Sequence, residues 1–232
     1  MVRPLHALVR KVTDHYLYHP TPGPTDNWEY GCHRYVEGSD RVFFFCHGNM
    51  GNASQRLHWV GVFGPGHYYL HEYAGFGSRY QKDALRRDVL VNRARAAIRT
   101  LPAGPLFFIG ESLGTGIVCE LAESFRPRGL VLLTPYSTMT AMAHRFFPVM
   151  GPLFLPDRYN TVHYLRNLQW YDHPPLVLIV AGLRDTIIPR RQIQQVAKAG
   201  QGTIFWYGGD HEDLFARRSE WLSLVREALV VA

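Results

Sequence analysis

A single serine framed by two glycines places the tightest constraint on how this chain folds. Residues 106–109 form a short apolar run typical of a buried strand, residues 113–125 read as a helix, and Gly110-Glu111-Ser112-Leu113-Gly114 joins the two. A sharp strand-to-helix turn strains its central residue, and glycines on both sides relieve the crowding. The turn exposes the Ser112 hydroxyl at the positive end of the helix dipole. A flexible loop is the alternative, but the context favours a nucleophile on a sharp elbow.

A serine hydroxyl is a weak nucleophile that needs a base, and the base needs an acid to orient it. Behind an elbow the expected order along the chain is serine, then acid, then histidine. Asp185 follows the apolar run 175–181, and His211 follows the apolar run 203–207 and two glycines. Functional groups of open α/β sheets lie beyond the carboxyl ends of the strands. We therefore predict that Ser112, Asp185 and His211 form a catalytic triad.

Each member of this set also has a simpler interpretation. Asp185 could cap a helix that begins near Pro189. His211 could be an ordinary surface histidine, since the chain has 12 of them. Asp210 could replace Asp185 as the acid, although neighbouring residues on a loop rarely present side chains that face each other. The shared order and position at strand ends favour the triad.

A tetrahedral intermediate also needs hydrogen-bond donors for its oxyanion. The backbone N–H of Leu113, directly after the nucleophile, is the expected first donor. The apolar run 41–46 is followed by His47-Gly48-Asn49-Met50-Gly51-Asn52, whose glycines allow the backbone to approach a ligand. We expect the Asn49 N–H to be the second donor. An ordinary glycine-rich turn is the alternative.

Strand and helix patterns alternate along most of the chain. A strand pair is expected at 28–36 and 41–46, joined by a turn at 38–40. Alternation of this kind predicts an α/β fold with a mostly parallel sheet flanked by helices. Further strands are expected at 67–73, 106–109, 130–134, 176–181 and 203–207, and helices at 81–100, 113–125, 189–199 and 217–230.

Two segments do not follow this alternation. Residues 135–175 are rich in Met and Phe, and could form a lid over an acyl-binding groove or complete the core. If they form a lid, Phe146 and Phe147 would contact the substrate together with Met50. Residues 1–19 form an amphipathic N-terminal segment, which either rests weakly on a membrane surface or packs on its own domain.

Composition narrows the possible partners. The net charge is +6, but the arginines are scattered among acidic residues, which favours a solvated surface over nucleic-acid binding. No apolar run is long enough to span a bilayer, and no secretory signal opens the chain. The three cysteines, Cys32, Cys46 and Cys119, are expected to be buried thiols in the cytoplasm. No spacing matches a metal site or a phosphate-binding loop, so no cofactor is expected.

Five motifs in order give this chain a wider resemblance, which covers about residues 18 to 225. They are 45–52, Glu72-Tyr73-Ala74-Gly75-Phe76-Gly77-Ser78, Gly110–Gly114, 182–189 and Gly208-Gly209-Asp210-His211-Glu212. The set resembles the α/β-hydrolase superfamily. It is most similar to abhydrolase-domain serine hydrolases with a His-Gly-Asn oxyanion loop, a branch that includes depalmitoylases and lysophospholipases. Two departures are Ala74, where relatives often carry Arg, and Asp210, where they usually carry a small or apolar residue.

The resemblance implies an α/β-hydrolase domain over residues 20–232, with the lid-like insertion at 135–175. It also implies the roles given above for Ser112, Asp185 and His211 and for the N–H groups of Asn49 and Leu113. The expected activity is cofactor-independent cleavage of a small-molecule or lipid-like acyl ester or thioester through an acyl-enzyme. A peptidase or amidase on the same triad, and a binding protein with little turnover, stay open as alternatives. The oligomeric state is not predicted.

Overall fold

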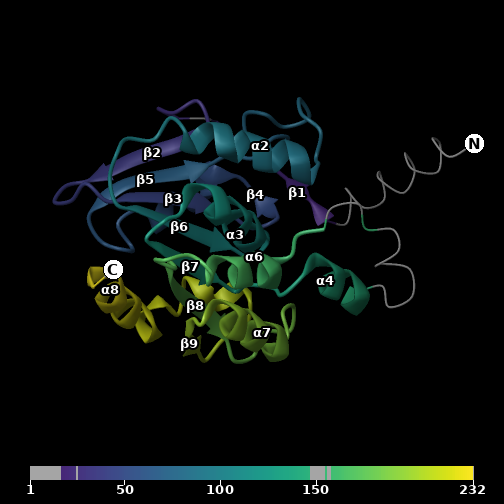
Figure 1. The fold of residues 1–232 in the computed structure, drawn as a ribbon. Helices are drawn as coiled ribbons and strands as arrows, with labels where there is room; N and C mark the ends of the chain where they lie inside the picture. The colour runs from purple at the N-terminus through teal and green to yellow at the C-terminus, as the bar shows by residue number, and fades with distance from the viewer. Residues whose placement is uncertain (1–16, 25, 147–154, 156–157, 232) are drawn as a thin grey trace, which may run out of the picture.

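The computed structural model describes residues 17–24, 26–146, 155 and 158–231. Its centre is a seven-stranded sheet in the order β2-β5-β3-β6-β7-β8-β9 (Figure 1). Every neighbouring pair is parallel except β2 and β5, which run antiparallel. The strands are β2 (Gly31–Val36), β3 (Val42–Cys46), β5 (Gly66–His71), β6 (Leu106–Glu111), β7 (Gly129–Leu133), β8 (Leu176–Gly182) and β9 (Thr203–Tyr207).

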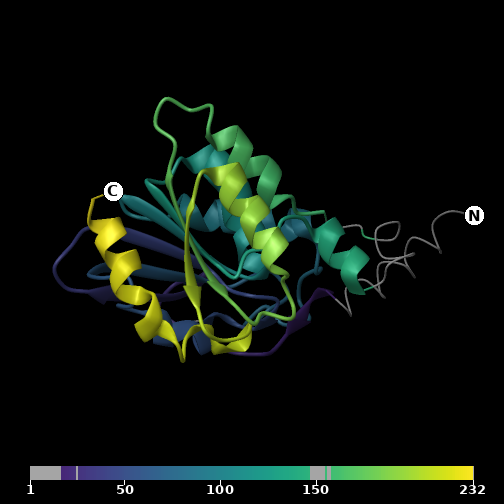
Figure 2. The same cartoon turned by 90° about the horizontal axis from the view of Figure 1, so that it is seen from below.

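Helices cover both faces of the sheet, as the side view shows (Figure 2). One face packs against α2 (Arg87–Ile98), α3 (Leu113–Phe125), α6 (Thr161–Leu168) and α7 (Arg190–Gly200). The other packs against the short helix η1 (Ala53–Trp59) and the C-terminal α8 (Leu222–Val230). The predicted α/β-hydrolase architecture, a mostly parallel sheet between two helical layers, is confirmed.

The central strands are apolar along their whole length because both of their faces are covered. All five residues of β3 are buried, and successive side chains enter opposite cores: Phe44 joins the cluster around α3, whereas Phe43 and Phe45 join the cluster around α8. β7 and the last six residues of β8 are buried in the same way. Continuous apolar strands of this kind are typical of parallel sheets with helices on both faces.

The prediction that the strands at 28–36 and 41–46 pair with each other is wrong. β5 lies between β2 and β3, and pairs antiparallel with β2 and parallel with β3. β2 carries half-buried His33 and Arg34 and exposed Tyr35, so it suits the edge of the sheet, whereas the fully apolar β3 needs a neighbour on each side. The turn at 38–40 therefore belongs to a connection that passes β5 to reach β3, and it does not close a hairpin.

Several boundaries also differ from the prediction. The helix expected at 81–100 begins at Arg87, and the segment expected to be helical at 217–230 is divided between η3 (Arg218–Glu220) and α8. The remaining named elements are β1 (His19–Pro20), β4 (Met50–Gly51), α4 (Met139–Phe146) and η2 (Glu212–Leu214), with β1 and β4 paired in parallel.

The described part of the insertion 135–175 contributes to the core. Met139, Leu155, Tyr159 and residues of α6 are buried in the cluster around α3. The Phe146 side chain and Phe147 lie outside the described residues, so the lid stays a prediction. Residues 1–16 of the amphipathic segment also lie outside them. Among the described residues, no helix is both long and apolar enough to cross a membrane, and Cys32, Cys46 and Cys119 are buried and free.

Candidate active site

Ser112 lies at a sharp turn between β6 and α3, with a φ of 48° and a ψ of −110°. A Cβ on Gly110 would lie 2.7 Å from the Cα of Thr115, and a Cβ on Gly114 would lie 2.8 Å from the His47 carbonyl oxygen. Real Cβ atoms essentially never come within 3.0 Å of such atoms. Both glycines are therefore required because the backbone passes too close for any side chain.

The first turn of α3 is anchored around the serine. The Ser112 N–H donates to the Leu133 carbonyl at 2.9 Å, and its carbonyl accepts from the N–H of Thr115 at 3.0 Å and its hydroxyl at 2.6 Å. Leu113 is the first helical residue, so its N–H has no intrahelical acceptor. Among the described residues this N–H is available to a ligand beside Ser112.

The structure brings Ser112, Asp185 and His211 together. The Nε2 of His211 lies 3.2 Å from the Ser112 Oγ, and its Nδ1 lies 2.8 Å from the Asp185 Oδ2. The other oxygen of Asp185 accepts the N–H groups of Ile187 at 2.9 Å and Ile188 at 2.8 Å. Asp185 does not cap a helix, because α7 begins at Arg190 with Pro189 as its N-cap and no side-chain cap bond. One of its oxygens instead shapes its own loop, and the other meets the imidazole.

Asp210 does not compete for this position. It is exposed, and its Oδ1 accepts the backbone N–H of Glu212 at 3.0 Å. Among the described residues the imidazole of His211 therefore contacts Asp185 and not Asp210, while the catalytic role of Asp185 stays a prediction.

Hydrogen bonds at the ends of β8 and β9 set the positions of the two loops. The Arg184 N–H donates to the Gly209 carbonyl at 2.9 Å, and the Tyr207 hydroxyl donates to the Asp210 carbonyl at 2.7 Å. A Cβ on Gly209 would lie 2.6 Å from the Cβ of Asp213. Gly209 thus lets the loop fold back closely enough to place the ring of His211 against Asp185.

The protonation of His211 is set by opposing effects. Burial lowers the pKa of the imidazole, while the hydrogen bond and charge of Asp185, with Glu212 and Glu111 farther out, raise it. The net result is a pKa above the ordinary 6.5. Because Nδ1 donates to a carboxylate, the neutral ring presents the lone pair of Nε2 to the serine hydroxyl.

The loop after β3 lies against the elbow. A Cβ on Gly48 would be 3.6 Å from the Cβ of Ser112, so the two backbones are close neighbours. The Nδ1 of the fully buried His47 lies 2.7 Å from the Gly48 carbonyl oxygen and donates to it. In a trans peptide the N–H points opposite to the C=O, so the Asn49 N–H points away from this ring. It has no acceptor among the described residues.

The side chain of Asn49 faces the N-terminal segment and not the elbow. Its Nδ2 donates to the Leu17 carbonyl at 3.1 Å, while its backbone carbonyl accepts the His19 N–H at 2.9 Å. Met50 follows with 58% of its surface exposed. The N–H groups of Asn49 and Leu113 both lie beside the elbow without an acceptor among the described residues. Their role as oxyanion donors and a substrate contact for Met50 stay predictions.

Sequence reasoning missed the side chains that support these groups. They are His47 and Glu72, both fully buried with Nε2 and Oε1 3.4 Å apart, and the ion pair between Arg56 and Glu111. One signal was available: Glu111 is a charged residue at the end of an apolar strand, directly before the nucleophile.

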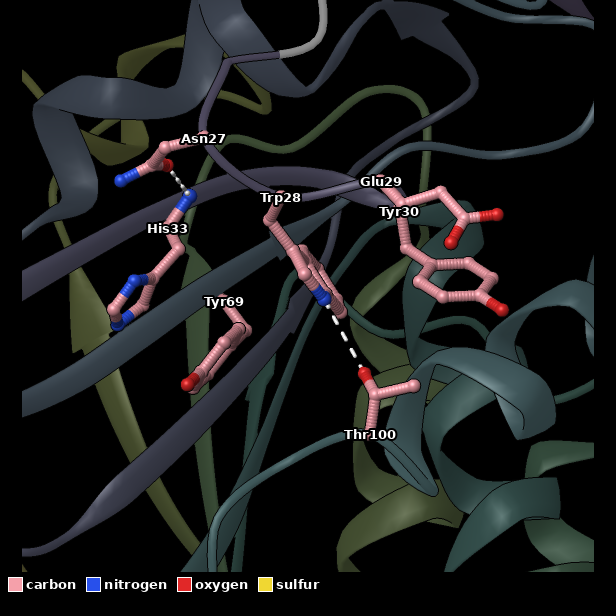
Figure 3. A pocket seen from close by; sticks show the side chains of 7 residues that line it. All are labelled: Asn27, Trp28, Glu29, Tyr30, His33, Tyr69 and Thr100. Carbon is pink, nitrogen blue, oxygen red and sulfur yellow. Dashed lines mark hydrogen bonds between the residues drawn. The ribbon is translucent and has the colours of Figure 1, made fainter.

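A separate pocket of about 300 Å³ lies at the β2 edge of the sheet (Figure 3). Trp28 stands between Tyr69 and Tyr30, and its indole N–H donates to the Thr100 hydroxyl at 3.3 Å. Asn27, Glu29 and His33 complete the lining. β3 separates the strands of this pocket from β6, so it is distinct from the site around Ser112.

Comparison with solved structures identifies the architecture. An esterase from Pyrococcus furiosus superposes with a TM-score of 0.67 at 15% identity, over 92% of this chain and 97% of the esterase. The chain has the α/β-hydrolase fold. An α/β hydrolase from a Medee basin deep-sea metagenome library gives a TM-score of 0.63 at 12% identity, covering 83% of this chain and 92% of the other. The thioesterase domain of the curacin biosynthetic pathway gives 0.62 at 12%, covering 84% and 93%.

Sequence comparison adds little about activity. The chain is 30% identical to an uncharacterized protein of Mycobacterium tuberculosis over 180 residues, which cover 70% of this chain and 58% of that relative. No protein-family model matches the chain. The narrower resemblance to depalmitoylases and lysophospholipases therefore stays a prediction.

Proposed function

We propose that this protein is a serine hydrolase that cleaves acyl esters or thioesters through an acyl-enzyme. The observation that carries the proposal is the chain of contacts from Asp185 to His211 to Ser112, at 2.8 Å and 3.2 Å, with Ser112 at a positive φ on the elbow. A serine with a base in reach, and a third group orienting that base, is the arrangement needed for nucleophilic catalysis.

In the proposed reaction His211 Nε2 takes the proton of the Ser112 hydroxyl as the oxygen attacks the acyl carbon. Asp185 keeps the proton of the neutral ring on Nδ1 and stabilises the imidazolium that forms. The imidazolium then protonates the leaving alcohol or thiol. Water, activated by the same Nε2, attacks the acyl-enzyme and releases the acid and free Ser112.

The oxyanion of each tetrahedral intermediate would accept hydrogen bonds from the N–H groups of Leu113 and Asn49. Both belong to backbone that is held in place before substrate arrives: Leu113 by the anchored first turn of α3, and Asn49 by His47 on the preceding carbonyl. Donors fixed in advance stabilise developing charge without reorganisation, which is commonly the largest single contribution to such reactions.

The preference for esters and thioesters rests on the chemistry named for the structural neighbours, which include an esterase and a thioesterase domain. The substrate would be a small or lipid-like acyl compound. A peptidase or amidase would use the same groups, because the triad does not distinguish these leaving groups by itself. Weak membrane contact through residues 1–19 and a cytoplasmic location remain expectations from sequence.

The direct test is a panel of p-nitrophenyl esters of increasing chain length beside the matching anilides and acyl thioesters. Wild-type protein should turn over the oxygen esters or thioesters, and Ser112→Ala should lose on the order of 10⁴-fold to 10⁶-fold in kcat while it keeps its fold by circular dichroism. Retained turnover in purified Ser112→Ala would refute the nucleophile. Faster cleavage of anilides than of esters would favour the amidase.

A further inference from the structure

An ion pair lies directly beside the proposed nucleophile. Glu111, the residue before Ser112, receives two parallel hydrogen bonds from Arg56, with Nε 2.8 Å from Oε2 and the terminal nitrogen 2.9 Å from Oε1. Each side chain is only 17% exposed. A two-point contact between a guanidinium and a carboxylate fixes orientation as well as distance, which a single contact does not.

Both members of the pair also meet the loop that follows β3. The guanidinium of Arg56 donates a third hydrogen bond, at 3.2 Å, to the Met50 carbonyl. On the other side of the loop, a Cβ on Gly48 would lie 3.1 Å from the Glu111 Oε1. Asn49, which carries the proposed oxyanion N–H, lies between these two contact points in the chain.

The pair joins three separate parts of the fold. Arg56 belongs to η1, Glu111 ends β6 and enters the elbow, and the Met50 carbonyl belongs to the loop itself. On the opposite side, the same loop is held by the His19 N–H on the Asn49 carbonyl at 2.9 Å. The ion pair therefore holds one side of the loop against the elbow, and the N-terminal segment contacts its other side.

Building on the proposed function, we propose that Glu111 and Arg56 are positioning residues for the oxyanion site. Their ion pair holds residues 48–51 against the elbow, so that the Asn49 N–H and the Leu113 N–H converge on one oxygen. Neither side chain is required to touch the substrate. A mispositioning of about 1 Å can cost about 100-fold in rate, so a small loop movement would be visible in kcat.

A second consequence follows from charge. Glu111 contributes to the raised pKa of His211, because a negative charge near the ring favours the imidazolium. Loss of that charge should lower this pKa and move the acid limb of the pH–rate profile to lower pH. Loss of the Arg56 charge removes a positive neighbour and cannot cause the same downward movement. The acid limb therefore reports the charge of Glu111, whereas a loss in kcat without a change in KM reports the position of the loop.

The test compares Glu111→Gln, Arg56→Gln, Arg56→Lys and the double Glu111→Gln/Arg56→Gln variant with wild type on p-nitrophenyl butyrate. Glu111→Gln and Arg56→Gln should each lower kcat by about 10-fold to 100-fold, with KM changed by less than about twofold, since a donor is misplaced and not removed. The double variant should lose about as much as either single one, because the two act as a unit. Arg56→Lys keeps the positive charge but loses the two-point contact with the carboxylate, and it should retain more activity than Arg56→Gln.

Glu120→Gln is the matched control. Glu120 is also a buried carboxylate paired with arginines, but it lies in the second half of α3, away from the loop. The control variant should leave kcat and the acid limb unchanged. Unchanged kcat in stable Glu111→Gln or Arg56→Gln protein would overturn the positioning role, as would an equal loss in the control. If Glu111→Gln does not fold, the two Arg56 variants decide, since the proposal requires a higher kcat for Arg56→Lys than for Arg56→Gln. Absence of Ser112-dependent turnover in wild type would instead refute the proposed function.

Discussion

Adding one methyl group at Gly114 sets two known effects against each other. Gly114 is the second residue of α3, and in an exposed helix the change from glycine to alanine stabilises by about 1 kcal/mol. Here the new Cβ would meet the carbonyl oxygen of Cys46 most closely, and would lie 2.7 Å from its carbonyl carbon and 2.8 Å from the carbonyl oxygen of His47. All three are backbone atoms, in the last residue of the central strand β3 and the residue after it.

The clash should win this competition. Ordinary contact begins at 3.4 Å, and the Cys46 carbonyl oxygen would lie even nearer to the new Cβ than the 2.7 Å of its carbonyl carbon. The helix and β3 must therefore separate by more than about 0.7 Å. Overpacking against atoms that cannot rotate away costs about 3 kcal/mol, so Gly114→Ala should lose about 2 kcal/mol net of the gain in helix propensity. For a chain of this size that corresponds to a Tm lower by about 4–8 °C.

The measurement is thermal and urea unfolding followed by circular dichroism. Gly208→Ala is the control, because its Cβ would meet only side-chain ends of Arg217 and Glu220, at 3.4 Å and 3.5 Å. It should change the free energy of unfolding by less than about 0.5 kcal/mol. Ester hydrolysis by folded Gly114→Ala should fall about 100-fold, because the elbow moves relative to the oxyanion loop. A variant as stable as wild type would refute the argument for the close approach.

Three further outcomes follow from the site. Asp185→Asn should lower kcat by about 10⁴-fold because it favours the wrong tautomer of His211. Asp210→Asn should lower kcat far less, because the Asp210 carboxylate faces its own loop. If an ester assay of both variants gives the reverse order, Asp210 is the acid. The acid limb of the kcat/KM profile should lie above pH 6.5, because only the neutral ring of His211 accepts the proton and its pKa is raised. Glu212→Gln removes a negative charge that raises this pKa, so it should move the limb to lower pH. An upward movement would contradict this. Finally, kcat/KM should rise from acetyl to hexanoyl esters, because each methylene that is buried contributes about 0.8 kcal/mol. The rise should be less steep in Met50→Ser. A preference for acetyl esters would rule out an apolar groove.

The contacts among Ser112, Asp185 and His211 could be expected from the sequence because they depend on local signals. Ser112 is marked by its glycines, and Asp185 and His211 each follow an apolar strand. The carboxyl ends of parallel strands meet at one edge of a sheet, so three residues at strand ends become neighbours once the sheet is parallel. The contact of His211 with Asp185 and not with Asp210 agrees with the same argument about strand ends.

The order of the strands did not follow, because it depends on partners distant in the chain. The turn at 38–40 is local and visible, whereas the insertion of β5 between β2 and β3 is set by how all seven strands share the two cores. The bond between Arg56 and Glu111 was hidden for the same reason, since the residues are 55 positions apart. The charge of Glu111 at the end of an apolar strand was a local signal, but it did not identify Arg56 as its partner.

Covalent labelling is the most direct test of the central claim, that Ser112 is a nucleophile activated by His211. Intact-protein mass spectrometry after treatment with a fluorophosphonate should show one adduct per chain, and peptide mapping should place it on Ser112. Ser112→Ala should show none, and His211→Ala should label far more slowly although its serine is intact. Labelling at another residue, or equal labelling of wild type and His211→Ala, would contradict the account.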